Sequence, residues 1–465
     1  MKKITILPLV FLTSLISLDT EATNDSMINQ LPSECSDLNI LADKPYKILP
    51  CFATTLGNNR TNQSAIRDAY RQFHALNWPV KPGSIGLADF DAKYTSLPDT
   101  YPVWQSWPTT AEVESNLHNN WGETHIVLPE SCRSAPSMQD FIESKNLKDS
   151  AHWGTPLVLE QFRNPQGHIL TDRNGQKTFY TVHLNKPAFD YLKDLRASNI
   201  TRFDYPEGIA DDGEARGAIF AKAAWRKITS TETKVYHSAI AYILEPNENG
   251  VTNCSMSIVG LSGLHITSKN NPKNVNPSEK TSTTNKWSWA TYIFKESVPH
   301  FSQNKNGNYT LEKNDILPRK NKLWGYFSMN SEEISNLCTT DGELDYTKST
   351  CPINTAQCKT LGKTCPPDQI VAYPILQDQE NLNSYNSETR KRLKSSVWGN
   401  YNIINNQWSD NGIPSPKVLA NPVLEPFHGP KSSCSSCHQE ANKPIFKDYI
   451  FNPGISADIK SLIKE

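Results

Sequence analysis

Residues 431–440 read KSSCSSCHQE and contain Cys434, Cys437 and His438 in the spacing C-x-x-C-H. Two thiols at this spacing on a helical turn can each add to a vinyl group of one haem and form two thioether bonds. The histidine that follows then offers its imidazole to the iron as the proximal ligand. The motif predicts haem c, with one covalently attached haem per chain.

Two other kinds of site use paired cysteines, and the sequence argues against both. A four-ligand zinc site needs a second C-x-x-C or H-x-x-H pair, and the sequence contains neither. A thioredoxin-like redox pair opens a helix early in a βαβ unit, whereas this motif lies far along the chain. Haem attachment is therefore the preferred interpretation.

The start of the sequence has the features of an export signal, which bacterial c-type haem attachment requires. Lys2 and Lys3 precede an apolar run at 4–18, and 20–22 (Thr-Glu-Ala) offers small residues for cleavage. The run is shorter than the about 20 apolar residues of a membrane-spanning helix. We predict a signal peptide at 1–22, no integral membrane segment after its cleavage, and a periplasmic or secreted protein.

The other eight cysteines agree with export, because an even number of them can form structural disulfide bonds in an oxidising compartment. Cys35 and Cys51 can close one local loop. The cluster at 338–365 lies in a segment that is rich in Thr, Pro and Gly and can be held by bridges of its own. Cys132 and Cys254 are the pair that is left over.

Charge and size limit the classes of protein to which the chain can belong. It has 47 Lys and Arg against 48 Asp and Glu, a formal net charge of −1, and the two signs are mixed throughout. We therefore expect no nucleic-acid partner. The roughly 440 residues after the signal peptide suffice for one large domain or two to three ordinary ones.

The apolar spacing predicts the elements that must position the motif. Residues 62–79 have helical spacing, which Pro79 ends. From 155 to about 300 the spacing becomes that of strands, and Asn174-Gly175 marks a hairpin. Four further strands are expected at 217–228, 234–246, 254–269 and 286–294. We predict an α+β fold with a mostly antiparallel β central domain, peripheral helices and a C-terminal haem-attachment segment.

The same spacing suggests a division of the chain. After the signal peptide we expect a helical and irregular region at 23–150 and the antiparallel β domain at 151–300. The region 301–465 is expected to hold the disulfide-bearing irregular segment and then the haem segment. Within it, 387–402 is a predicted helix with Ser387 as its N-cap.

Several stretches outside the motif carry a family resemblance. They are ALNWP at 75–79, GAIFAKAAWRK at 217–227, VGLSGLHITSK at 259–269 followed by WSWATYIF at 287–294, and LANPVLEPF at 419–427. With them the chain resembles a group of bacterial exported c-type cytochromes, uncharacterised in function, with a single C-terminal C-x-x-C-H motif. The resemblance spans most of the mature chain and implies haem and export, but no particular substrate.

Only the haem motif transfers defined roles from this group to Cys434, Cys437 and His438. The chain departs from the group at Lys295 and Glu296, where the group has an acidic residue and a histidine after the phenylalanine. We therefore assign no role to this loop.

The sixth ligand of the iron must come from upstream, or water must fill its place. A small mobile cytochrome has its ligating methionine downstream of the motif, but 439–465 contain neither Met nor His. His265 is the first candidate, because Gly260 and Gly263 would let a bulky planar ring approach the strand. Met256, on the same predicted strand, is the second. Each also fits an ordinary strand residue packed in a sheet.

Two functional classes follow from the two possible states of the iron. With two protein ligands the chain is an electron-transfer protein, and its partner is a redox protein. With an open site it is a haem enzyme, peroxidase- or oxygenase-like, that acts on a small-molecule substrate in the β domain. The sequence contains no recognisable distal His–Arg pair, so electron transfer is the preferred prediction. A haem-tethered binding protein is the third class.

Overall fold

The computed structural model describes part of the chain. The described residues are 62–89, 101–115, 120–122, 128–147, 153–160, 170–172, 174–197, 204–207, 217–246, 251–269, 287–298, 301–303, 309–311, 325–326, 339–340, 343–344, 379–394, 396–410, 413–424 and 433–439. The predicted signal peptide, Cys35, Cys51 and the cysteine cluster at 338–365 lie outside them.

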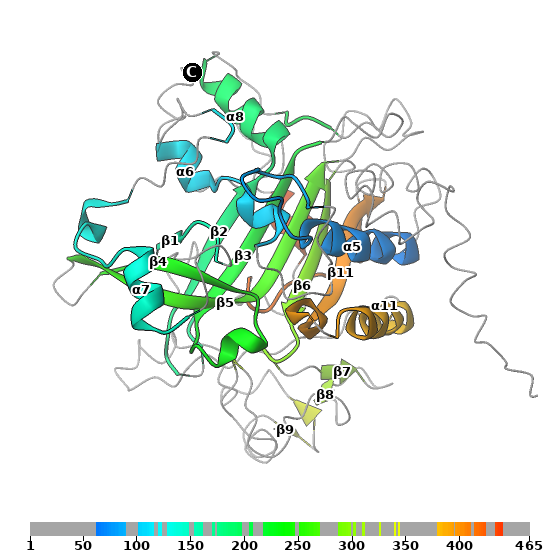
Figure 1. Ribbon diagram of the computed structural model, residues 1–465. Coiled ribbons are helices and arrows are strands. Elements are labelled where there is room, and N and C mark those ends of the chain that lie inside the picture. The colour runs from blue at the N-terminus through cyan, green and yellow to red at the C-terminus, as the bar shows by residue number, and fades with distance from the viewer. Residues whose placement is uncertain are drawn as a thin grey trace, which may run out of the picture.

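The described chain alternates between a few helices and many strands (Figure 1). The α-helices are α5 (Asn62–Leu76), α6 (Thr110–Ser115), α7 (Met138–Ser144), α8 (Lys186–Ala197), α11 (Gln379–Arg392) and α12 (Cys434–Gln439). The 3₁₀ helices are η2 (Val103–Ser106), η3 (Glu130–Cys132), η5 (Glu232–Lys234) and η7 (Val397–Asn400). The strands are β1 (Leu157–Glu160), β2 (Thr178–Leu184), β3 (Ile219–Lys227), β4 (Ser238–Pro246), β5 (Thr252–Lys269), β6 (Trp287–Phe294), β7 (Phe301–Gln303), β8 (Tyr309–Leu311), β9 (Thr339–Thr340), β10 (Glu343–Leu344), β11 (Tyr401–Asp410) and β12 (Ile413–Ser415).

An eight-stranded sheet forms the centre of the fold, and β5 is its longest strand. β4 pairs with the first half of β5 and β6 with the second half, whereas β3 pairs with 259–268 across the junction. β2 extends the sheet beyond β3, β1 beyond β4, and β11 and β12 beyond β6. Among these described pairs only β1–β4 is parallel, so the predicted α+β fold with a mostly antiparallel sheet and peripheral helices is confirmed. β7, β8, β10 and β9 form a second, smaller sheet.

Helices α5 and α11 lie side by side on one face of the sheet, beside β6 and β11 (Figure 1). The Tyr292 hydroxyl of β6 donates to the Ala69 carbonyl oxygen at 2.6 Å, and Asn406 Nδ2 of β11 donates to the Ala65 carbonyl oxygen at 3.0 Å. We call this side of the sheet the α5 face. The apolar stripe that predicts α5 is buried against it: Ile66, Ala69, Tyr70, Phe73 and Leu76.

The opposite side, which we call the α12 face, carries the C-terminal part of the described chain. Even-numbered residues of β3 and odd-numbered residues of β6 point to it, because side chains alternate along a strand. One apolar cluster on this face brings together residues from β3, β6 and α12 with the chain just before that helix. We call it the α12 cluster; among its members are Phe220, Trp287, Trp289, Leu419 and Cys434.

Two further apolar clusters lie along the α12 face. Ala224, Ile293 and Val423 belong to the one in the middle. Met256 and Phe141 belong to the one at the far end of β5, where α7 packs. The chain therefore covers this face with separate segments rather than with one pair of helices.

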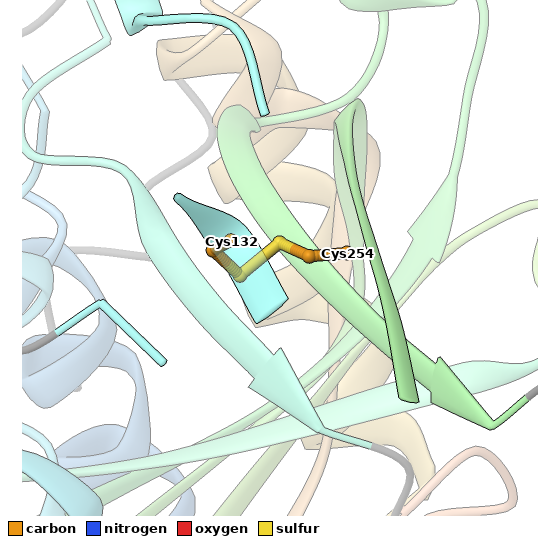
Figure 2. The surroundings of a disulfide bond; sticks show 2 residues. All are labelled: Cys132 and Cys254. Atoms are coloured by element: carbon orange, nitrogen blue, oxygen red, sulfur yellow. A yellow bond between two sulfur atoms is a disulfide. The ribbon is translucent and has the colours of Figure 1, made fainter. Parts of the chain in front are cut away.

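A disulfide bond joins Cys132 of η3 to Cys254 of β5, as Figure 2 shows. The two Cα atoms are 5.0 Å apart, and 122 residues of sequence separate the cysteines. Cys132 and Cys254, the pair that remained after the other cysteines were grouped, therefore form a disulfide bond. The bond links η3, which precedes α7, to the first residues of β5, close to Met256.

The C-terminal half of the chain differs from the sequence prediction in the bounds of one helix and in the strand that follows it. The predicted helix at 387–402 overlaps α11 (Gln379–Arg392) only over 387–392, so Ser387 lies inside that helix and is not its N-cap, and Tyr401–Asp410 is the strand β11. Asn and Gln are not strand-favouring residues, but pairing with β6 over the length of β11 overrides that local preference. The sheet therefore combines strands from the predicted regions 151–300 and 301–465.

His183 of β2 gives the folded protein a pH-dependent stability. Its ring lies 2.9 Å from the Trp107 carbonyl oxygen and 3.1 Å from Thr181 Oγ1, and it is 1% exposed. Burial lowers the pKa of His183 to about 4, against about 6.5 in an unfolded chain. Between these values the unfolded chain binds a proton that the folded protein excludes, so stability falls as the pH is lowered through this window.

We expect His183→Gln to remove up to about 3 kcal/mol of this pH dependence between pH 6.5 and pH 4, and to leave the slope above pH 6.5 unchanged. Urea unfolding of the wild type and the variant at a series of pH values measures the two slopes. If both proteins lose stability equally between pH 6.5 and pH 4, His183 is not the group responsible.

Candidate functional site

Gln407 of β11 fixes the first residues of α12 to the sheet. Its Oε1 accepts hydrogen bonds from the backbone N–H of Ser435 at 2.8 Å and from Ser433 Oγ at 3.2 Å. Its Nε2 donates to the Pro416 carbonyl oxygen at 2.6 Å, and Leu419 pairs with Ser433 in a parallel bridge. A single buried amide thus connects β11, the chain after β12 and the helix that contains the C-x-x-C-H motif.

Two of the three Cys and His residues of the motif, Cys434 and His438, pack against the α12 face. Cys434 is 7% exposed, and its Sγ lies 3.5 Å from the Leu419 carbonyl oxygen, within the α12 cluster. The half-buried ring of His438 lies 5.9 Å from the ring of Trp289, at an interplanar angle of 40°. Cys437 falls in the same helix, but its side chain is outside the described part of the chain.

A row of polar side chains crosses the α12 face beside this cluster. The strand register places Lys222 of β3 opposite His265 of β5, His265 opposite Thr291 of β6, and Thr291 opposite Asn405 of β11. His265, Thr291 and Asn405 are buried, and Lys222 is half-buried. We call these four residues the polar row. A polar line across four neighbouring strands is unusual on a sheet face that is otherwise covered by apolar side chains.

The chain before the motif crosses the sheet next to the polar row. Asn421 Nδ2 donates to Thr291 Oγ1 at 3.0 Å and to the Tyr292 carbonyl oxygen at 2.7 Å. A Cβ atom on Gly263 would lie 2.4 Å from Val423 Cγ2, so this glycine lets 419–424 approach β5. The prediction that Gly263 admits a planar ring is therefore corrected, because Val423 and Asn421 take up that space.

The structure separates the two candidate distal ligands. His265 lies in the polar row, beside Thr291 and two residues along the sheet from Trp289, whose ring contacts His438. Met256 lies on the same face of β5 but nine residues away, up to about 30 Å along an extended strand, in the cluster with Phe141. The fold thus places His265, and not Met256, on the strand next to β6, whose Trp289 contacts His438 of α12.

Two buried hydrogen-bond donors at this site find no acceptor among the described residues. They are Nε1 of Trp289 and Nδ2 of Asn405, and both residues are 0% exposed. The register shift between Ile403 and Asn405 is a β-bulge, which puts Asn405 on the α12 face although Ile403, two residues earlier, lies on the α5 face. Each unsatisfied buried donor costs about 1–3 kcal/mol, so a bound group with acceptor oxygens would stabilise the pair. A haem, whose propionates are acceptors, fits these donors.

Three comparisons with known proteins add no identification: no family model, no curated protein and no solved structure matches the chain. Across the described residues, no three His, Cys, Asp or Glu side chains gather closely enough to hold a metal ion. None of the described helices is long and apolar enough to cross a membrane. Function is therefore inferred from the motif and from the sheet face beneath it.

Sequence reasoning missed the residues that form the site around the motif, namely Lys222, Trp289, Thr291, Asn405 and Gln407. A signal was present in WSWATYIF, where Thr291 interrupts a row of Trp287, Trp289 and Ile293 on one face of the strand. The run Asn405-Asn406-Gln407 was the second signal, because three consecutive amides within a strand must place polar groups on both faces.

We expect Gln407→Leu to detach the start of α12 and Asn406→Leu to leave it in place. The two residues are neighbours on β11 and are equally buried, but Asn406 bonds to Ala65 on the α5 face. Loss of the bonds to Ser433 and Ser435 should speed amide hydrogen exchange in 433–439 by roughly tenfold. Mass spectrometry of peptides that cover this segment measures it. Equal exchange rates in the two variants would contradict the assigned role of Gln407.

Proposed function

We propose that the chain is an exported c-type cytochrome, as its sequence resemblance implies, with one covalently bound haem and electron transfer as its function. The observation that carries the proposal is the placement of a C-x-x-C-H helix against a buried sheet face that has two unsatisfied donors. Cys434 and Cys437 would form the thioether bonds, and His438 would be the proximal ligand. A bound haem supplies an iron centre that exchanges one electron between its ferric and ferrous states.

The surroundings of α12 support a haem that is enclosed between this helix and the sheet. Cys434 points into the apolar α12 cluster, and His438 lies on Trp289. Apolar walls exclude water from a cofactor and tune its reduction potential. His265 lies on the same face, so we propose it as the distal ligand. A site with two histidine ligands and restricted access suits electron transfer to a redox partner protein.

The polar row supports a second candidate function, that of a haem enzyme with an open iron site. Lys222 and Thr291 lie opposite His265 on the neighbouring strands, and polar side chains of this kind can hold a small polar substrate. The two functions differ in whether His265 ligates the iron. The ligation state is therefore the property to measure.

A periplasmic or secreted location is part of the proposal. The Cys132–Cys254 disulfide supports it, because such bonds form and persist in oxidising compartments. Haem attachment to C-x-x-C-H takes place in the same compartment in bacteria. The predicted signal peptide at 1–22 supplies the route to it.

Haem attachment is tested by producing the full chain in a bacterial host that matures c-type cytochromes. We expect haem to stay with the wild-type chain on a denaturing gel and after acid–acetone extraction, because thioether bonds survive both. Cys434→Ala combined with Cys437→Ala should remove all retained haem. Cys132→Ala combined with Cys254→Ala is the matched control, which should lower stability but keep the haem. Haem that extracts freely from the wild type would refute the proposal.

The choice between carrier and enzyme is tested by the electronic spectra of the ferric and ferrous protein. We expect a low-spin spectrum and slow carbon monoxide binding, and His265→Ala should convert the protein to high spin. Met256→Ala is the control and should leave the spectrum unchanged, because that residue packs at the far end of β5. A high-spin wild type that binds carbon monoxide at once would favour the enzyme.

A further inference from the structure

We propose that Trp289 and Asn405 receive the propionate carboxylates of the haem and so orient it on the sheet. This inference rests on the proposed function and adds to it two binding residues that the C-x-x-C-H motif does not contain. The two residues come from neighbouring strands of the α12 face, and neither lies within the motif's own helix.

The first support is that both side chains present a buried donor without an acceptor. Trp289 Nε1 and Asn405 Nδ2 find no hydrogen-bond partner in the described part of the chain, and both residues are 0% exposed. The orientation of the Asn405 amide is set, because its Oδ1 accepts the backbone N–H of Asn406 at 2.7 Å. Both atoms can therefore only donate, and they need a ligand that offers acceptor oxygens.

The second support is the spacing of the two donors. Asn405 pairs with Thr291 and Gln407 pairs with Trp289, so Trp289 and Asn405 are diagonal neighbours across β6 and β11. Diagonal neighbours lie about 7–8 Å apart at their Cα atoms. This separation suits the two carboxylates of one haem, which extend from adjacent positions on the same edge of the ring.

The third support is charge and proximity to the motif. Propionate carboxylates are anionic acceptors, to which the N–H donors of Trp289 and Asn405 can bond. Hydrogen bonds to a charged acceptor are about twice as strong as neutral ones. The ring of Trp289 also lies 5.9 Å from the ring of His438, so a haem held by that histidine lies next to this donor.

The test separates recognition of the carboxylates from recognition of the porphyrin ring. The full chain with Cys434→Ser and Cys437→Ser, purified without haem, is titrated with iron protoporphyrin IX and with its dimethyl ester. The free acid should bind at least roughly tenfold more tightly than the ester, because only the acid offers charged acceptors. Trp289→Phe and Asn405→Leu, each added to this background, should weaken the free acid by roughly tenfold and the ester clearly less, because the ester carbonyls are neutral acceptors.

The matched controls are Trp408→Phe and Asn406→Leu in the same background. Both residues are buried in β11, and alternation along the strand places them on the α5 face. They should change the affinity for neither porphyrin. Circular dichroism of every variant verifies that the sheet is folded before titration.

Three results would overturn the inference. The acid and the ester could bind equally to the background, the Trp289 and Asn405 variants could weaken both compounds alike, or the background could bind neither compound. None of them affects the proposed function, which stands or falls on covalent haem in the wild-type chain. A wild type without covalent haem would instead remove the proposed function.

Discussion

The pairing of β11 with β6 is the interaction on which the candidate site depends. Three consecutive amides of β11 are used on both faces of the sheet: Asn406 holds α5, Gln407 holds α12, and Asn405 extends the polar row. Each of these buried amides would destabilise the strand if it had no partner. Asn406 and Gln407 therefore need the helices on the two faces, and the helix that Gln407 holds carries the C-x-x-C-H motif.

Apolar spacing predicts the parts of this fold whose burial is regular. α5, β3, β4, β5 and β6 lie where their patterns place them, because each buries a continuous apolar stripe or run. β11 could not be found in this way, since YNIINNQWSD has no apolar alternation and its stability comes from pairing with a strand more than a hundred residues earlier. The bulge in β5 near Gly263 is likewise a tertiary feature, needed where 419–424 cross the strand.

The candidate site likewise has one part that the sequence predicts and another that it does not. Cys434, Cys437 and His438 lie within five consecutive residues, so the sequence is enough to predict haem attachment. Which residues face the motif depends on how α12 lies on the sheet, and no local pattern contains that information. His265 could be named in advance and lies on the relevant face. Trp289 and Asn405 could not, because the lack of an acceptor becomes visible only when their neighbours are known.

Peptide mass spectrometry of the mature protein shows whether a haem is bound through both cysteines of α12. After proteolysis, we expect one peptide containing Cys434, Cys437 and His438 whose mass is raised by a single haem, with both thiols resistant to alkylation. The same peptide recovered without haem, with its two cysteines alkylated or joined to each other, would contradict the account.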